Sequence, residues 1–173
     1  MKNQSITEAM LQFIEESSTA FHAAANVEAL LLENGFEKLE NLAEGALVPG
    51  GSYYTMQNGS AVLAVKIPEN PAKGFRIAAS HSDSPCFKIK EVPEMKVENT
   101  YVKLNVEKYG GMILSPWLDR PLSVAGRVFV AGKDGKPEAK LVNLKKDLLI
   151  IPNVAIHFNR EINNGFAYNP QTD

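Results

Sequence analysis

The chain has 173 residues, which is long enough for one ordinary domain or two small ones. Hydrophobic residues make up 45% and charged residues 22%, a composition typical of a soluble globular protein and not of a disordered one. The formal net charge of −2 gives no electrostatic basis for binding nucleic acid or an anionic membrane, and no apolar run approaches the ~20 residues that span a bilayer. Cys86 is the only cysteine, and the start lacks the apolar core of a signal peptide. A cytoplasmic protein without internal disulfides is therefore predicted.

Two helices are predicted at the start of the chain. Ser5 and Glu8 have the spacing of a capping box, and apolar residues then recur at helical spacing: Ile6, Met10, Phe13 and Ile14. Residues 17–19 break this helix, and a second helix follows with the apolar stripe Ala20, Ala24, Val27 and Leu31. Gly35 stands where a left-handed C-terminal cap belongs. His22 lies near the start of the second helix, and we interpret it as structural.

Strands are predicted next. Residues 52–57 and 60–67 form a hairpin around Asn58-Gly59, a strong turn signal. Residues 61–65 are almost continuously apolar, as expected of a strand covered on both faces. Residues 75–79 are predicted to form a short buried strand of the same sheet. Helices followed by a covered sheet indicate the start of an α/β fold.

The pattern changes after Cys86. Apolar and polar residues alternate through 87–89 and 102–106, and a second hairpin is predicted from 122–131 and 139–144 around Asp134-Gly135. This half is predicted to be a distinct antiparallel β module, either a small barrel or a sandwich, with its boundary near residues 90–93. Residues 148–157 are strongly apolar, yet no closing helix or strand is predicted after them.

His81 and Asp83 are the strongest candidates for chemistry. The pair His-x-Asp follows the predicted strand 75–79, and open α/β sheets place their ligands at the carboxyl ends of strands. A neutral imidazole is the commonest protein ligand for zinc, and a nearby carboxylate often fixes its orientation. The pattern alone is also compatible with a surface turn. A catalytic zinc needs about three protein ligands, so partners must come from elsewhere in the fold.

The other candidate residues remain open on the sequence alone. His157 lies among apolar neighbours and could be a core residue or a functional one. Asp119 and Arg120 could form a local salt bridge or line a pocket. Cys86 is interpreted as an inert thiol, and no Gly-x-Ser-x-Gly elbow is present to activate a serine.

Five sequence blocks, read in order, resemble the N-terminal part of the aspartyl aminopeptidase family of binuclear zinc exopeptidases. The longest and most specific block is Trp-Leu-Asp-Arg-Pro-Leu at 117–122 with Ala-Gly-Arg-Val at 125–128. Residues 109–111 belong to the same block. The other four blocks are residues 18–22, 35–36, 81–85, which contain His81, and 151–157, which contain His157.

The resemblance implies an α/β fold, in which residues 1–90 form the N-terminal part of a zinc-exopeptidase-like catalytic domain. Residues 91–173 would belong to an inserted antiparallel β domain, present only in part, that mediates dimerisation within a homo-oligomer. His81 is implied to be a zinc ligand, and Asp83 a catalytic residue that orients its ring. His157 is implied to bind substrate at the active site of a neighbouring subunit. A complete site of this family would hold two Zn²⁺ ions, with other divalent metals as alternatives, and would remove N-terminal, acidic residues from peptides.

The family pattern also includes a bridging aspartate, a general-base glutamate with an adjacent glutamate ligand, a further carboxylate and a final histidine. None of these is present in the sequence, so we expect the chain as given to be a fragment that cannot catalyse alone. The alternative is a non-catalytic β-rich assembly or binding module that has kept the sequence of the family. The partners expected are peptide substrates, with neither nucleic acid nor membrane.

Overall fold

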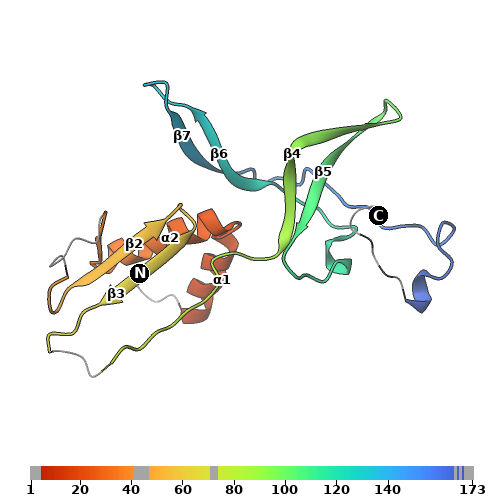
Figure 1. The fold of residues 1–173 in the computed structure, drawn as a ribbon. Helices are drawn as coiled ribbons and strands as arrows, with labels where there is room; N and C mark the ends of the chain where they lie inside the picture. The colour runs from red at the N-terminus through yellow and green to blue at the C-terminus, as the bar shows by residue number, and fades with distance from the viewer. Residues whose placement is uncertain (1–4, 41–46, 71–73, 166, 168, 170–173) are drawn as a thin grey trace. The chain divides into compact units, whose positions relative to one another are not determined.

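The computed structural model of the chain describes residues 5–40, 47–70, 74–165, 167 and 169. These residues belong to two compact units, each assembled from two stretches of sequence (Figure 1). Unit 1 comprises residues 1–83 and 124–145, and unit 2 comprises residues 84–123 and 146–173. The chain therefore passes from unit 1 to unit 2 twice.

Both predicted helices are confirmed in unit 1. Helix α1 spans Ile6–Glu16 and begins with the predicted capping box: the Glu8 carboxylate accepts from the Ser5 backbone N–H at 2.9 Å, and Ser5 Oγ accepts from the Glu8 N–H at 3.2 Å. Helix α2 spans Ala20–Glu33. It ends at Gly35, whose φ of +76° allows the Phe36 N–H to reach back to the Leu31 carbonyl at 3.0 Å. No helix among the described residues is both long and apolar enough to cross a membrane.

The predicted hairpin is present and belongs to a three-stranded sheet. Strand β2 (Ser52–Gln57) pairs antiparallel with β3 (Ala61–Lys66), and the short strand β1 (Glu37–Lys38) pairs parallel with β2. Asn58 and Gly59 both have positive φ, 54° and 68°, and the Ser60 N–H donates to the Gln57 carbonyl at 3.1 Å. This is the turn that Asn-Gly favours, because its twist matches that of the strands.

The sheet is less covered than the sequence predicted. Helix α2 packs against the sheet (Figure 1), but the Leu63 side chain remains 62% exposed, so the prediction that residues 61–65 are covered on both faces is wrong. Residues 75–79 form no strand, and Phe75 and Ile77 are 86% and 87% exposed. An apolar run becomes a buried strand only when a neighbour pairs with its backbone and a second layer covers it. No described strand pairs with this segment, and no described layer covers it.

A polar cluster ties α2 to the sheet. The Tyr54 hydroxyl, on a side chain that is fully buried, donates to Glu28 Oε1 at 3.0 Å, and Lys38 Nζ lies 2.8 Å from the same oxygen. The hydrogen bond from Lys38, assisted by that from Tyr54, lowers the pKa of the Glu28 carboxyl. Burial, reinforced by the Glu28 carboxylate, raises the pKa of Tyr54, which keeps the phenol a donor.

Replacing Glu28 by glutamine is expected to flatten the acid limb of the stability curve. The folded-state pKa of Glu28 lies below its unfolded value, so its contribution is complete above the unfolded pKa and is lost as pH falls through the folded one. Because the pair is partly exposed, we expect a modest effect. Between about pH 5 and pH 3 the unchanged chain should lose about 0.5–1 kcal/mol more of its free energy of unfolding than the Glu28→Gln variant. Urea titrations at several pH values would measure it. Glu33→Gln, an exposed position on the same helix, is the control; an equal change there would contradict the assignment.

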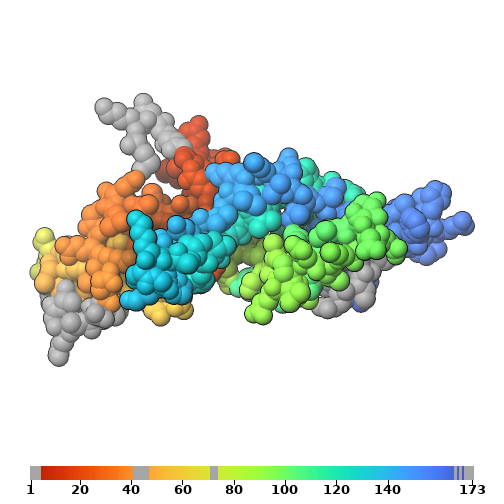
Figure 2. Space-filling view, turned by 90° about the horizontal axis from the view of Figure 1, so that it is seen from above, coloured from red at the N-terminus to blue at the C-terminus, as the bar shows by residue number. Residues whose placement is uncertain are grey.

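The second predicted hairpin is also confirmed, and it belongs to unit 1. Strand β6 (Ala125–Ala131) pairs antiparallel with β7 (Pro137–Asn143), and Gly135 in the connecting turn has a φ of +77°. The hairpin contacts α2, and Figure 2 shows its cyan atoms against the orange atoms of the N-terminal elements. Asn143 Nδ2 also donates to Ser18 Oγ, just before α2, at 2.9 Å.

Unit 2 is built on a third hairpin. Strand β4 (Cys86–Val97) pairs antiparallel with β5 (Tyr101–Tyr109), and two short 3₁₀ helices follow, η1 (Ser115–Trp117) and η2 (Ile162–Asn164). The Phe87 ring packs edge-on against Trp117 with centroids 5.3 Å apart. Isolated bridges join Leu118 to Ile151 and Leu122 to Leu149. These contacts tie residues 148–151 to the loop after η1.

The predicted domain boundary near residues 90–93 falls inside β4. The pairing register shifts between Ile89 and Glu94, where Pro93 has no N–H to give to the ladder, and Asn105 Nδ2 donates to the Val92 carbonyl at 3.4 Å. Residues 90–93 thus lie at a bulge of this hairpin, and the functional boundary near them stays a prediction. The described β strands after residue 84 form two two-stranded sheets, β4–β5 in unit 2 and β6–β7 in unit 1, and the barrel or sandwich stays a prediction.

Candidate functional site

The candidate site in unit 1 is the loop of residues 81–83. It follows residues 75–80, which form no regular secondary structure, and lies beside the β2–β3 turn, where Ser82 Oγ donates to the Ser60 carbonyl at 2.7 Å. This hydrogen bond fixes the residue between the two candidates. The loop is thus anchored at its centre, and His81 and Asp83 are the residues directly before and after the anchor.

His81 and Asp83 contact each other as the sequence predicts. His81 Nδ1 lies 2.8 Å from Asp83 Oδ1, with the imidazole side chain 90% exposed and the carboxylate side chain 34% exposed. A neutral ring that donates its Nδ1–H to the carboxylate presents the lone pair of Nε2 outward. In metal-binding histidines, the ring nitrogen that does not bind the metal almost always donates its N–H to such a partner. The pair therefore has the chemistry of one ligand of a metal centre together with its orienting carboxylate.

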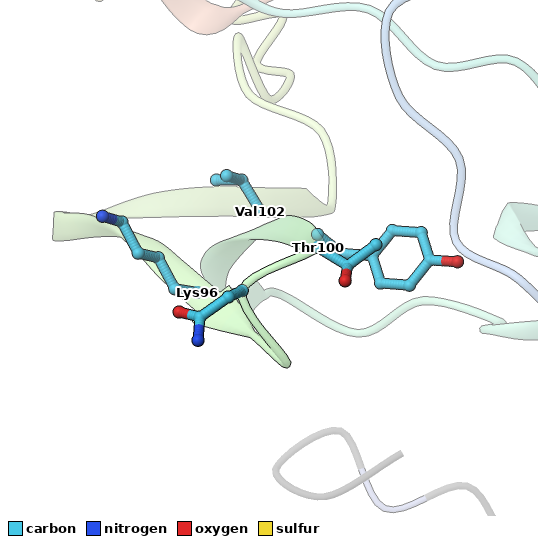
Figure 3. Close-up of a pocket in the computed structure, with 5 residues that line it drawn as sticks. Lys96, Thr100 and Val102 are labelled. Atoms are coloured by element: carbon cyan, nitrogen blue, oxygen red, sulfur yellow. The ribbon is translucent and has the colours of Figure 1, made fainter.

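The remaining ligands of such a centre are not among the described residues. No group of three or more His, Cys, Asp or Glu side chains in this part of the chain is placed to hold a metal ion. Because a catalytic zinc needs about three protein ligands, His81 fits the metal as a single donor only. A shallow hollow of about 160 Å³ at the tip of the β4–β5 hairpin is lined by Lys96, Asn99, Thr100, Tyr101 and Val102 (Figure 3). Its lining offers neither carboxylate nor imidazole, so it is no metal site.

His157 lies in unit 2 on a hydrogen-bonded turn, where the Phe158 N–H donates to the Ala155 carbonyl at 2.8 Å. The residue is exposed, so the structure does not support its interpretation as a core histidine. Its imidazole is free to meet a molecule from outside the described chain. His22, in contrast, places Nδ1 2.7 Å from Thr19 Oγ1 at the start of α2, in agreement with a structural role.

Asp119 anchors the segment that leads to His157. Its Oδ1 accepts from the Asn153 N–H at 2.9 Å, and its own N–H donates to the Ile151 carbonyl at 2.9 Å. Within the described chain it forms no ion pair with Arg120, whose guanidinium lies 3.5 Å from the Pro116 carbonyl instead. The local salt bridge considered from the sequence is therefore replaced by a side chain that fixes a distant backbone.

Comparison with known proteins identifies relatives described as zinc metalloproteases and aminopeptidases. Residues 13–173 match the family described as aminopeptidase I zinc metalloprotease (M18). The chain is 47% identical over 177 aligned residues to a probable M18 family aminopeptidase 2 of Clostridium acetobutylicum, an alignment that covers 100% of this chain and 41% of the relative. A second relative of the same description, from Clostridium novyi, is 45% identical with the same coverage. The chain thus spans about two fifths of the length of these relatives.

Solved structures show the same fold. The cryo-EM structure of the Ape4 and Nbr1 complex matches with a TM-score of 0.85 at 36% identity, covering 92% of this chain and 31% of that one. The structure of Chaetomium thermophilum mApe1 matches with a TM-score of 0.80 at 35% identity, covering 88% and 35%. The chain belongs to the M18 family of aminopeptidase I zinc metalloproteases, as the motif blocks predicted.

Proposed function

We propose that this chain is the N-terminal part of a zinc-dependent aminopeptidase that removes N-terminal residues, preferably acidic ones, from peptides. The observation that carries the proposal is the 2.8 Å contact between His81 Nδ1 and Asp83 Oδ1 in a chain that matches the M18 family over residues 13–173. In this role His81 gives Nε2 to the metal, and Asp83 keeps the ring in the tautomer that can bind it. Bound zinc would supply Lewis-acid polarisation of the scissile carbonyl and a water of lowered pKa.

His157 is proposed to bind substrate at the active site of a neighbouring subunit. Its exposure on a turn supports this role, since an accessible imidazole can donate a hydrogen bond to a substrate carboxylate. The β-rich part from residue 91 onward is proposed to mediate assembly of a homo-oligomer. Large apolar side chains exposed on the β4–β5 hairpin, Val92, Tyr101 and Val102, support a protein contact there. The functional division at residue 90, two zinc ions per complete site and a cytoplasmic location stay predictions.

The chain alone is proposed to lack activity, because the described residues offer one histidine ligand and no group of three metal-binding side chains. A chimera in which this chain replaces the matching part of the Clostridium acetobutylicum relative would supply the remaining length. We expect the chain alone to give background hydrolysis of Asp-, Glu- and Leu-p-nitroanilide with zinc present. The chimera should bind zinc and release Asp or Glu at least about tenfold faster than Leu.

Each outcome decides one part of the proposal. A chimera that melts like its parent yet binds no zinc would overturn the enzyme assignment and favour a non-catalytic assembly module. Equal rates on Asp- and Leu-p-nitroanilide would overturn the acidic preference alone. Zinc-dependent hydrolysis by the isolated chain would overturn its proposed incompetence.

A further inference from the structure

Two hydrogen bonds connect strand β6 to the His81 loop through the β2–β3 turn. At one side of this turn Arg127 Nη1 donates to the Asn58 carbonyl at 2.6 Å, and at the other side Ser82 Oγ donates to the Ser60 carbonyl at 2.7 Å. Residues distant in sequence, 58 and 127, are thus joined within unit 1. Arg127 belongs to the Ala-Gly-Arg-Val motif at 125–128, and neither the proposed zinc ligand His81 nor the proposed substrate-binding His157 makes use of it.

The Arg127 guanidinium is held in place by aromatic rings. Its Cζ lies 4.0 Å from the centroid of the Phe21 ring on α2 and 5.3 Å from that of Phe129, two residues further along β6. A planar guanidinium stacks on aromatic faces while its N–H groups remain available in the plane, which a lysine ammonium cannot reproduce. Arg127 therefore fixes the turn relative to α2, and does not simply neutralise a charge.

The turn between these two hydrogen bonds is stiff. Asn58 and Gly59 both hold left-handed backbone conformations, and the Ser60 N–H closes the turn on the Gln57 carbonyl at 3.1 Å. A displacement of the Asn58 carbonyl therefore moves the Ser60 carbonyl with it. Because Ser60 holds Ser82, the displacement reaches the loop whose two ends are His81 and Asp83.

We infer that Arg127 is a positioning residue for His81, acting through the Asn58–Ser60 turn and Ser82. The inference rests on the proposed function of His81 as a zinc ligand. It extends that function by assigning to the β6–β7 hairpin, which lies far from His81 in sequence, the task of holding the ligand loop. The competing explanation is that Arg127 only stabilises the packing of β6 on α2.

The test compares zinc affinity, measured by chelator competition in the chimera, with thermal stability. We expect Arg127→Ala and Ser82→Ala each to weaken zinc binding about tenfold, the range seen when a residue behind a metal ligand is lost. The double variant should lose no more than the larger single effect, because both act through one turn. Arg127→Lys should recover only part of the affinity. Leu141→Ala removes the side chain of the β7 residue paired with Arg127, and should lower the melting temperature while zinc affinity stays within about twofold.

A second readout needs no metal. In the chain as given, ¹⁵N NMR of the His81 ring should show the Nδ1–H tautomer, and Arg127→Ala should shift the ring nitrogens toward a mixture of tautomers. Equal effects of Arg127→Ala and Leu141→Ala on zinc affinity, additive losses in the double variant, or an unchanged ring spectrum would overturn the inference. An unchanged zinc affinity in His81→Ala would instead overturn the proposed function. The spectrum of the His81 ring, compared with and without Arg127→Ala, would still test whether Arg127 positions that ring.

Discussion

Zinc binding by the chimera should fall by at least about 100-fold when His81 is replaced by alanine, since even residues behind a ligand cost 10–100-fold. The reason is geometric: among the described residues of unit 1, His81 is the one imidazole with a carboxylate partner, which engages Nδ1 at 2.8 Å and leaves Nε2 for a metal. Its side chain is 90% exposed and stabilises nothing by burial, so the variant should keep the melting temperature of the parent. Isothermal titration with zinc and a thermal melt would measure both.

His22→Ala is the matched control for this prediction. It removes the other imidazole of unit 1, whose ring nitrogen contacts Thr19 Oγ1 at 2.7 Å, and should lower stability slightly without changing zinc affinity. Asp83→Asn should fall between the two, about tenfold weaker, because the amide still occupies the space but no longer selects the tautomer. Equal zinc affinities in the His81 and His22 variants would remove His81 from the metal site.

Local elements could be read from the sequence because their causes are local. The capping box at Ser5, the left-handed cap at Gly35 and the Asn58-Gly59 turn each depend on residues within a few positions of one another. Strand β1 was not predicted, since two residues are too few to show an alternating pattern. The His81–Asp83 contact is also local, spanning two residues, so spacing and residue type were sufficient to find it.

The structural features that could not be predicted from the sequence depend on contacts between residues distant in the sequence. Residues 75–79 have the composition of a buried strand, but composition cannot supply the paired backbone and covering layer that a strand requires. The role of Arg127 as an individual residue cannot be predicted from the sequence, because its two ring contacts and its Asn58 hydrogen bond come from separate elements. One clue was present: an arginine directly before Val128 and Phe129 in an apolar strand needs a partner for its charge.

A large effect on stability is expected at Tyr53, which is 5% exposed in β2 and whose hydroxyl accepts the Val48 N–H at 3.3 Å. Tyr53→Ala should lower the free energy of unfolding by about 3–5 kcal/mol, as for other buried aromatic side chains. Tyr101→Ala on β5, where the ring is 69% exposed, is the control and should change it by less than about 1 kcal/mol. Urea unfolding followed by circular dichroism would measure both, and equal losses would show that Tyr53 is not part of the core.

Gly51 gives this prediction an internal check. A Cβ atom built at Gly51 would overlap the Tyr53 ring, so Gly51→Ala should cost about 1–3 kcal/mol through overpacking. The overlap disappears once the ring is gone, and in the Tyr53→Ala background the same substitution should be nearly neutral. Additive losses in the double variant would mean that the backbone of residue 51, and not the ring, is what requires glycine. Strong non-additivity would establish that glycine is needed there because the ring of a core tyrosine occupies the space of its side chain.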